Sequence, residues 1–103
     1  MSEHLSDQEI TRRVSEGQRL VDVGATYAHY KDPTKHYKVL KIGVLEATEE
    51  PCVIYQALYG SRMTWVRPLS SWLEPVPTEK GNVPRFFKAL SSQVERRAEN
   101  SEG

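Results

Sequence analysis

Two short runs of β-branched and aromatic residues, separated by a polar loop, constrain the fold of this chain most. The runs are residues 53–59 and 63–67, and Gly60 lies between them, a pattern typical of a β-hairpin. Alternate side chains of a strand point to opposite faces, and both faces of the first run are largely apolar. We therefore expect an inner strand of a sheet that closes on itself or is covered on both sides. Pro68 should end the second strand, because proline has no backbone N–H to donate.

The N-terminal segment has the pattern of a short helix. Residues 6–9 read Ser-Asp-Gln-Glu, a capping box in which the serine and glutamate side chains each bond the other's backbone N–H. Ile10 and Val14 lie four apart on one face. Gly17 fits the left-handed position that often follows the last turn. We therefore predict an N-terminal helical extension over residues 1–17.

Residues 18–90 are predicted to form one small β domain. Val39 and Leu40 are adjacent apolar residues in one strand candidate, so their side chains must face opposite ways and the sheet should be curved or covered on both sides. Residues 83–87 could add a short strand pairing or plug one end of the barrel. Alternatively, a helix could begin near Phe86 and continue into a polar tail, residues 91–103, whose end we expect to be disordered. Besides the hairpin, the strand candidates are residues 18–23, 26–31, 36–45 and 71–76. The fold class predicted is mainly β: a small antiparallel barrel or roll, SH3-like, of about five strands.

Composition limits the classes of function. The 103 residues suffice for one domain with one modest core. Basic and acidic residues number 14 each, so no overall charge attracts nucleic acid or membrane, and any basic surface must be local. Cys52 is the single cysteine and should be a buried apolar residue of a strand. No secretion signal or membrane-spanning run is seen in the sequence, so we expect a cytoplasmic protein without membrane contact.

Several blocks along the chain resemble a known family. They read YxHYK at 27–31, YxVL at 37–40, YQALYG at 55–60, WVRPL at 65–69 and PRF at 84–86. In order and spacing they resemble the bacterial family catalogued as domain of unknown function 1653. The resemblance implies a small, mostly β, cytoplasmic bacterial protein with no established activity. One segment departs from the family, which typically has His-Ser-Glu-Thr where residues 45–48 here read Leu-Glu-Ala-Thr.

No catalytic constellation emerges from the sequence. His29 and His36 flank the turn at Asp32, and two imidazoles with a carboxylate could begin a metal site. No further histidine or cysteine lies near them, so we expect two structural histidines, one partly buried and one exposed. Cys52 lacks the sequence context of a nucleophile, and residues 46–50 read as a solvated acidic loop. We therefore predict neither a catalytic group, nor a metal, nor another cofactor.

The more informative pattern is the alternation of aromatic and basic residues in the strands. Aromatic faces that stack on bases, next to cations that contact phosphate, are the means by which small barrels bind single-stranded nucleic acid or nucleotides. Tyrosines in strands are also ordinary structural residues. The side chains that we expect to form one ligand-binding face are Tyr27, His29, Lys31, Tyr59, Trp65 and Arg67.

The leading hypothesis is therefore a non-enzymatic binding module for RNA or a nucleotide. Arg67 best separates this hypothesis from a purely structural interpretation. It shares a strand face with Trp65 in an apolar run, so it must stack on a ring, pair with a carboxylate or face a ligand. Pairing with a carboxylate such as Glu74 would make Arg67 structural, whereas an open guanidinium would indicate an anion or base site.

Two other hypotheses stay open. The first is a protein-interaction domain that uses the N-terminal helix or an edge strand near residues 73–75. An exposed apolar patch at Ile10 and Val14 would favour this hypothesis. The second is a small hydrolase or base-processing enzyme that acts through His29 and a carboxylate, which would require a deep pocket holding both groups.

Overall fold

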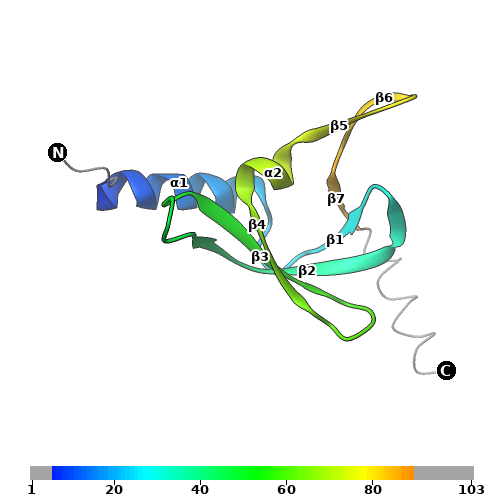
Figure 1. Cartoon of the computed structure of the whole chain (residues 1–103), viewed down its shortest axis with the longest axis horizontal. Coiled ribbons are helices and arrows are strands. Elements are labelled where there is room, and N and C mark those ends of the chain that lie inside the picture. Colours follow the sequence, from blue (N-terminus) through cyan, green and yellow to red (C-terminus); the bar gives the residue numbers. More distant parts are fainter. Residues whose placement is uncertain (1–5, 90–103) are drawn as a thin grey trace.

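The computed structural model describes residues 6–89. Five strands form one antiparallel sheet in the order β4-β3-β2-β1-β7, and β5 and β6 form a separate hairpin. Figure 1 shows this arrangement. The prediction of a mainly β, antiparallel fold with an N-terminal helix is confirmed. In order, the elements are α1 (Asp7–Leu20), β1 (Thr26–His29), β2 (Asp32–Val44), β3 (Pro51–Ala57), β4 (Thr64–Pro68), α2 (Leu69–Leu73), β5 (Pro75–Thr78), β6 (Gly81–Pro84) and β7 (Phe86–Lys88).

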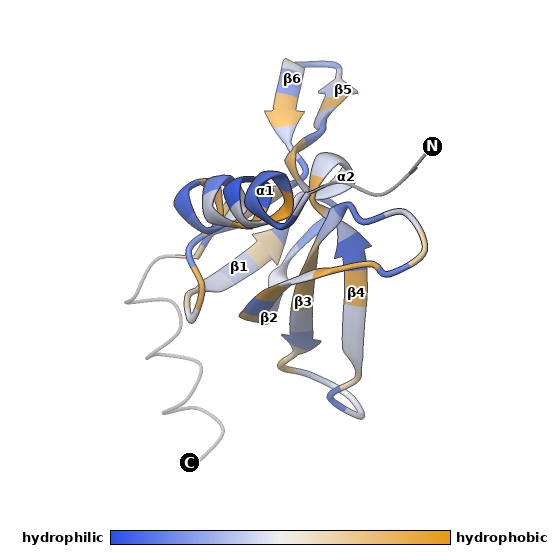
Figure 2. Ribbon diagram, turned by 90° about the vertical axis from the view of Figure 1, so that its left-hand side faces the viewer, coloured by the Kyte–Doolittle hydropathy of each residue, from blue (hydrophilic) through white to orange (hydrophobic). Residues whose placement is uncertain are grey.

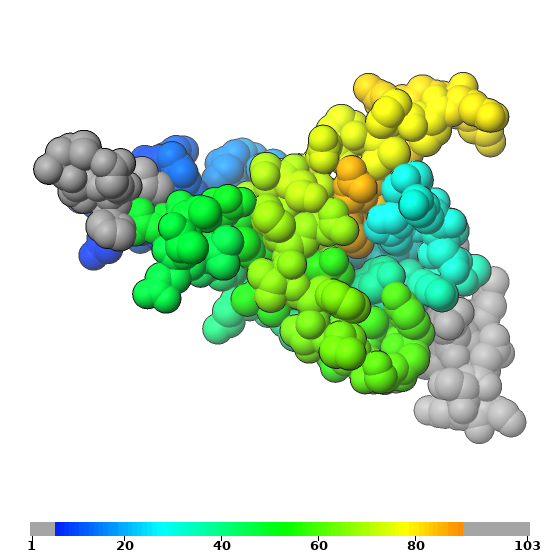
Figure 3. Space-filling model, viewed as in Figure 1, coloured from blue at the N-terminus to red at the C-terminus, as the bar shows by residue number. Residues whose placement is uncertain are grey.

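The main sheet has two edges, β4 and β7, which do not pair with each other among the described strands. Of the two predicted forms, barrel or roll, hydrogen bonding in this part of the chain does not close a barrel. The SH3-like topology stays a prediction. The β5–β6 hairpin stands out from the body of the molecule, as the space-filling view shows (Figure 3).

The central hairpin and the curvature of the sheet agree with the sequence analysis. Strands β3 and β4 pair in register, with Tyr55 opposite Trp65, and β4 ends at Pro68. The register of β2 against β3 shifts between Val39 and Lys41, so Leu40 is the extra residue of a bulge, which bends the strand.

Of the two hydrogen bonds predicted for the capping box of α1, one is present. The Ser6 hydroxyl accepts a hydrogen bond from the backbone N–H of Glu9 at 3.1 Å. The Glu9 carboxylate does not bond back to Ser6, because Arg12 and Arg13 bind it at 2.7 and 2.9 Å. These two guanidinium groups lower the pKa of Glu9 from 4.5 to about 2.

The prediction that Gly17 ends the helix is wrong, and so is the strand predicted over residues 18–23. Helix α1 continues to Leu20, and the N–H of Val21 closes its last turn on the Gly17 carbonyl at 2.8 Å. Gly17 is the buried residue of α1. A Cβ there would lie 3.1 Å from a methyl of Leu69. The glycine therefore permits close packing of the helix and does not form a left-handed cap.

Two predictions in the C-terminal half are corrected. Residues 71–76 do not form a strand, because Leu69–Leu73 is helix α2 and β5 begins only at Pro75. The helix considered from Phe86 is not present, whereas the alternative of a short pairing over residues 83–87 is confirmed, since Phe86–Lys88 is strand β7, paired with β1. The predicted polar tail, residues 91–103, lies outside the described residues.

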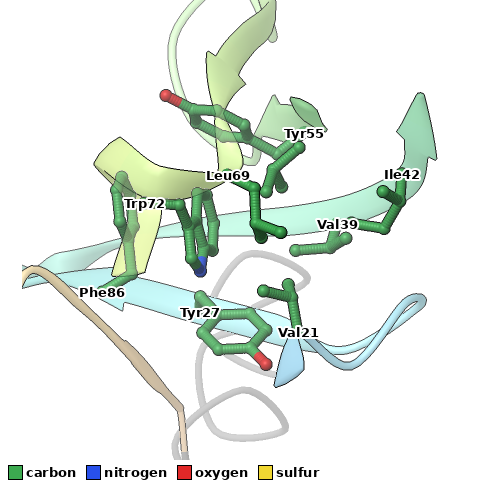
Figure 4. Packing of buried hydrophobic residues seen from close by; sticks show 9 residues of the cluster. Val21, Tyr27, Val39, Ile42, Tyr55, Leu69, Trp72 and Phe86 are labelled. Atoms are coloured by element: carbon green, nitrogen blue, oxygen red, sulfur yellow. The ribbon is translucent and has the colours of Figure 1, made fainter. Parts of the chain in front are cut away.

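The core lies between the sheet and the two helices, which cover the same side of the sheet (Figure 2). In this core the rings of Trp72 and Phe86 stack in parallel, with their centroids 3.8 Å apart (Figure 4). Neither helix in the described part of the chain is long and apolar enough to cross a lipid bilayer. The buried cluster comprises Val21, Tyr27, Val39, Ile42, Val53, Tyr55, Leu69, Trp72 and Phe86.

Candidate functional site

An open pocket of about 310 Å³ lies on the helix side of the main sheet, at the end where the aromatic residues gather. The strand registers explain this gathering. Tyr55 of β3 lies opposite Trp65 of β4, and His29 of β1 lies opposite Phe86 of β7. Directly opposite residues share a face of the sheet. The pocket is lined by His29, Tyr37, Tyr55, Tyr59, Trp65, Arg67 and Phe86.

Phe86 is the ring around which the pocket wall is built. It stacks on buried Trp72 and meets Tyr55 and His29 edge to face, at centroid distances of 5.7 and 5.0 Å. Edge-to-face contacts of this kind stabilise aromatic pairs beyond the burial of their area. Because these rings pack on one another as well as on the core, the wall is held rigidly before any ligand arrives.

Two tyrosine hydroxyls meet at the pocket. The hydroxyl oxygens of Tyr37 and Tyr59 lie 2.7 Å apart, and the two rings pack edge to face at 5.5 Å. Partial burial and the hydrogen bond with Tyr59 raise the pKa of Tyr37 well above 10.0. The Tyr37 hydroxyl is therefore protonated at neutral pH, as a tyrosine ordinarily is. One hydroxyl of the pair donates to the other, which leaves one O–H free to donate to a ligand.

Arg67 is a cation on the pocket wall that hydrogen-bonds a neutral side chain. One of its terminal nitrogens, Nη1, donates to the neutral hydroxyl of Ser71 at 2.9 Å, and its guanidinium carbon lies 5.4 Å from the centroid of the Phe86 ring. Among residues 6–89 no carboxylate forms an ion pair with it. Glu74, the carboxylate considered as a partner in the sequence analysis, instead pairs with Arg85 at 3.3 Å. Several N–H groups of Arg67 thus remain able to bind an anion.

His29 is positioned as a neutral donor. Its Nδ1 accepts the backbone N–H of Lys31 at 3.2 Å, so the neutral ring carries its proton on Nε2. Partial burial, and then the positive charges of Arg67, Arg85 and Lys31, lower the pKa of His29 below 6.5. The same cations make the potential at His29 positive, although the whole chain has no net charge.

Four of the six residues predicted as one ligand-binding face line this pocket, namely His29, Tyr59, Trp65 and Arg67. The other two do not line it. Tyr27 is buried against Trp72, and its hydroxyl accepts the backbone N–H of Asp22 at 2.9 Å. Lys31 contributes its backbone N–H to His29 and its charge.

Three further residues of the pocket, Tyr37, Tyr55 and Phe86, are not among the predicted site residues. A signal for Tyr55 exists in the sequence, since a correct register of the hairpin places it opposite Trp65. Phe86 is not predictable in this way, because its place depends on the three-residue strand β7.

The other chemical candidates do not come together. His36 is buried and lies opposite Ala28, on the face of the sheet away from His29, so the expectation of one exposed histidine is wrong. Within residues 6–89 no three His, Cys, Asp or Glu side chains gather as metal ligands. Cys52 is buried, as expected, and burial raises the pKa of its thiol. Two further hollows of about 350 Å³ each lie elsewhere among the described residues, and no aromatic ring lines either of them.

The sequence profile of a family described as "Protein of unknown function (DUF1653)" matches residues 25–88. The chain belongs to the DUF1653 family. Every residue that lines the pocket lies in the matched segment. The resemblance inferred from the sequence blocks is thus confirmed.

A solved DUF1653 structure shares the fold. It is described as the crystal structure of a protein belonging to DUF1653 from Bordetella bronchiseptica. The two chains are 33% identical, with a TM-score of 0.55, and the alignment covers 65% of this chain and 85% of the other. No curated protein matches this chain. The family assignment therefore fixes the fold and brings no activity with it.

Proposed function

We propose that this DUF1653 protein is a binding module for a ligand that combines a planar aromatic ring with a negative charge. A nucleotide and an unstacked base of single-stranded RNA both have this chemistry. The observation that carries the proposal is the guanidinium of Arg67, which has no carboxylate partner among the described residues and lies on the wall of a ring-lined pocket.

The size and chemistry of the pocket suit one ring. Small-molecule sites enclose roughly 300–1,000 Å³ and combine apolar walls with a few convergent polar groups. A pocket of about 310 Å³ lies at the small end of that range. Trp65 is 50% exposed, so its indole is free to stack on a base, and such stacking contributes about 1–3 kcal/mol per base.

The polar groups of the pocket are mostly donors. Arg67 would bind the phosphate, while the Nε2–H of His29 and the free hydroxyl of the Tyr37–Tyr59 pair could donate to acceptors on a base or sugar. No residue that lines the pocket carries a carboxylate. The pair of His29 and a carboxylate that the hydrolase hypothesis requires is therefore not found in its lining, and we favour binding over catalysis.

The protein-interaction hypothesis receives little support from the N-terminal helix. Val14 packs against the core and Ile10 is partly buried, so they do not form the exposed apolar patch that this hypothesis needs. A bacterial origin, a cytoplasmic location and the absence of metal and cofactor remain predictions from the sequence.

The proposal is tested by titrating the protein against a labelled single-stranded oligouridylate, with adenosine and uridine monophosphates as competitors. Arg67→Gln should weaken binding about tenfold or more, because a hydrogen bond to a charged group contributes about 1.5–3 kcal/mol. Raising the salt should also weaken binding, since phosphate contacts release counterions. Competition by mononucleotides would identify a free nucleotide as a sufficient ligand, whereas binding of the oligonucleotide alone would identify RNA.

Arg62→Gln is the matched control. Arg62 lies on the same hairpin, is exposed and does not line the pocket. Its replacement removes the same charge and should weaken binding less than about threefold. Equal effects of the two substitutions would show that only diffuse charge matters, and failure of both probes at low salt would overturn the proposal.

A further inference from the structure

Strand β4 presents an unusual edge. It is the last strand of the main sheet on one side. Val66, Met63 and Trp65 are 60, 52 and 50% exposed, the highest values among the large apolar residues in the described part of the chain. Residues of β4 form a visible part of the molecular surface in Figure 3. Three neighbouring apolar side chains at a strand edge are a site for association with another strand.

The backbone of β4 has hydrogen-bonding groups that point outward from the edge of the sheet. The Ala57 N–H donates to the Met63 carbonyl at 2.9 Å, and the register pairs Tyr55 with Trp65. Backbone groups point alternately to the two sides of a strand. Those of Trp65 therefore face β3, while the N–H and C=O groups of Thr64 and Val66 point away from the sheet.

The opposite edge of the sheet differs. Strand β7 has three residues, and one of them, Lys88, forms an ion pair with Asp22 at 2.9 Å. Short edge strands and lysines are the usual means of blocking edge-to-edge pairing. Strand β4 has no lysine, aspartate or glutamate, so its edge lacks this protection.

We propose that β4 pairs with β4 of a second copy of this chain, antiparallel, about a two-fold axis that passes by Trp65. In this register Thr64 of each copy lies opposite Val66 of the other. Each outward N–H then meets an outward C=O, and no backbone group of these residues stays unpaired. Pro68, which could not donate, lies outside the paired segment.

The side chains of this register are complementary. The two Trp65 side chains lie opposite each other on the pocket face, and aromatic pairs stabilise sheets. Arg67 lies opposite Met63 of the second copy, so the two Arg67 charges do not face each other. The chain has a formal net charge of +0, so no overall repulsion opposes association.

The pairing also bears on the pocket. A two-fold axis perpendicular to the sheet keeps the same face of both copies on one side, so both pockets open in the same direction. Trp65 of the second copy would then lie beside the pocket of the first. The dimer would thereby extend each pocket with a ring that one chain alone does not supply.

Sedimentation equilibrium from about 5 to about 500 μM protein tests this pairing, a range that brackets the modest affinity of so short an interface. The wild type should dimerise. Val66→Pro should be monomeric, because it removes an outward N–H that makes no bond to β3. Val66→Thr keeps that donor and the β-branch, and should dimerise within about threefold of the wild type.

Val66→Lys provides a second disrupting variant that leaves the backbone intact, and it too should be monomeric. Val44→Lys is its control, since Val44 is an exposed valine of another strand, and it should dimerise as the wild type does. A wild type that stays monomeric at the highest concentration would overturn the proposal, as would dimerisation of folded Val66→Lys.

Cross-linking tests the register itself. Trp65→Cys should give a disulfide-linked dimer under mild oxidation, because a non-hydrogen-bonded antiparallel pair has Cα atoms about 4.5 Å apart. Thr64→Cys should not, since the two copies of residue 64 lie about 7–8 Å apart on the diagonal. Cys52 is 2% exposed and does not compete. Cross-linking of Thr64→Cys in preference to Trp65→Cys would contradict this register.

Discussion

The role of Arg67 is decided by residues that follow it in the chain. Its strand face, shared with Trp65, is predictable from the period of a strand. The absence of an ion pair between Arg67 and any carboxylate of residues 6–89 is not predictable, because it depends on where Glu74 lies. The turn of helix α2 places Ser71 against Arg67 and leaves Glu74 to pair with Arg85. Short helices such as Leu69–Leu73 have too few residues to show a helical period in the sequence.

His29 should make stability depend on pH. Burial and the nearby cations Arg67, Arg85 and Lys31 lower its pKa below 6.5 in the folded state, so the unfolded chain binds the proton more tightly. The free energy of unfolding should therefore fall as the pH drops below about 6.5, and level off below the folded-state pKa. His29→Gln should remove this part of the dependence.

The measurement for His29 is an NMR titration of its ring protons, combined with urea unfolding of wild type and His29→Gln across the same pH range. The midpoint should lie below 6.5. Subtracting the variant's unfolding curve removes the contributions of the other histidines. A midpoint at or above 6.5 would contradict the environment described for this residue.

Helix α1 shows where prediction fails at the level of an element. The sequence indicates a helix end at Gly17, because glycine is the usual residue of a left-handed cap. In the structure Gly17 lies within the helix and faces Leu69 and Ile42, whose methyl groups would lie 3.1 and 3.4 Å from a Cβ added to it. A sequence alone does not distinguish a glycine that is required because the backbone has a positive φ from one that is required for close packing.

Gly17→Leu should destabilise the protein by about 1–3 kcal/mol, because the added side chain would overlap Leu69 where α1 packs on the core. Gly17→Ala should change stability by less than about 1 kcal/mol, since the gain in helix propensity offsets the tight contact. Ser15→Leu, at an exposed position of the same helix, should lie within about 0.5 kcal/mol of the wild type. Urea unfolding measures all three, and a Gly17→Leu variant as stable as the wild type would show that this face of α1 is not docked.

Over the whole molecule, the central hairpin, the curvature near Val39 and Leu40 and the mainly β class follow from the pattern of apolar residues and from the residue blocks of the family. The strand order does not follow from the sequence, because β7 joins the sheet beside β1 through only three residues. That pairing brings Phe86 opposite His29 and completes the pocket. The site is thus predictable where it depends on the β3–β4 hairpin and hidden where it depends on long-range pairing.

The central claim is that the ring-lined pocket binds an aromatic anion, and the two tryptophans provide its most direct test. Trp65 lines the pocket and is 50% exposed, whereas Trp72 is 3% exposed in the core. In NMR titrations of labelled protein at low salt, first with the oligouridylate and then with adenosine monophosphate, the indole N–H signal of Trp65 should shift with at least one of the two probes, together with amides of His29, Tyr59 and Arg67. The signal of Trp72 should move much less. No shift at Trp65 with either probe, or equal shifts at both indoles, would contradict the account.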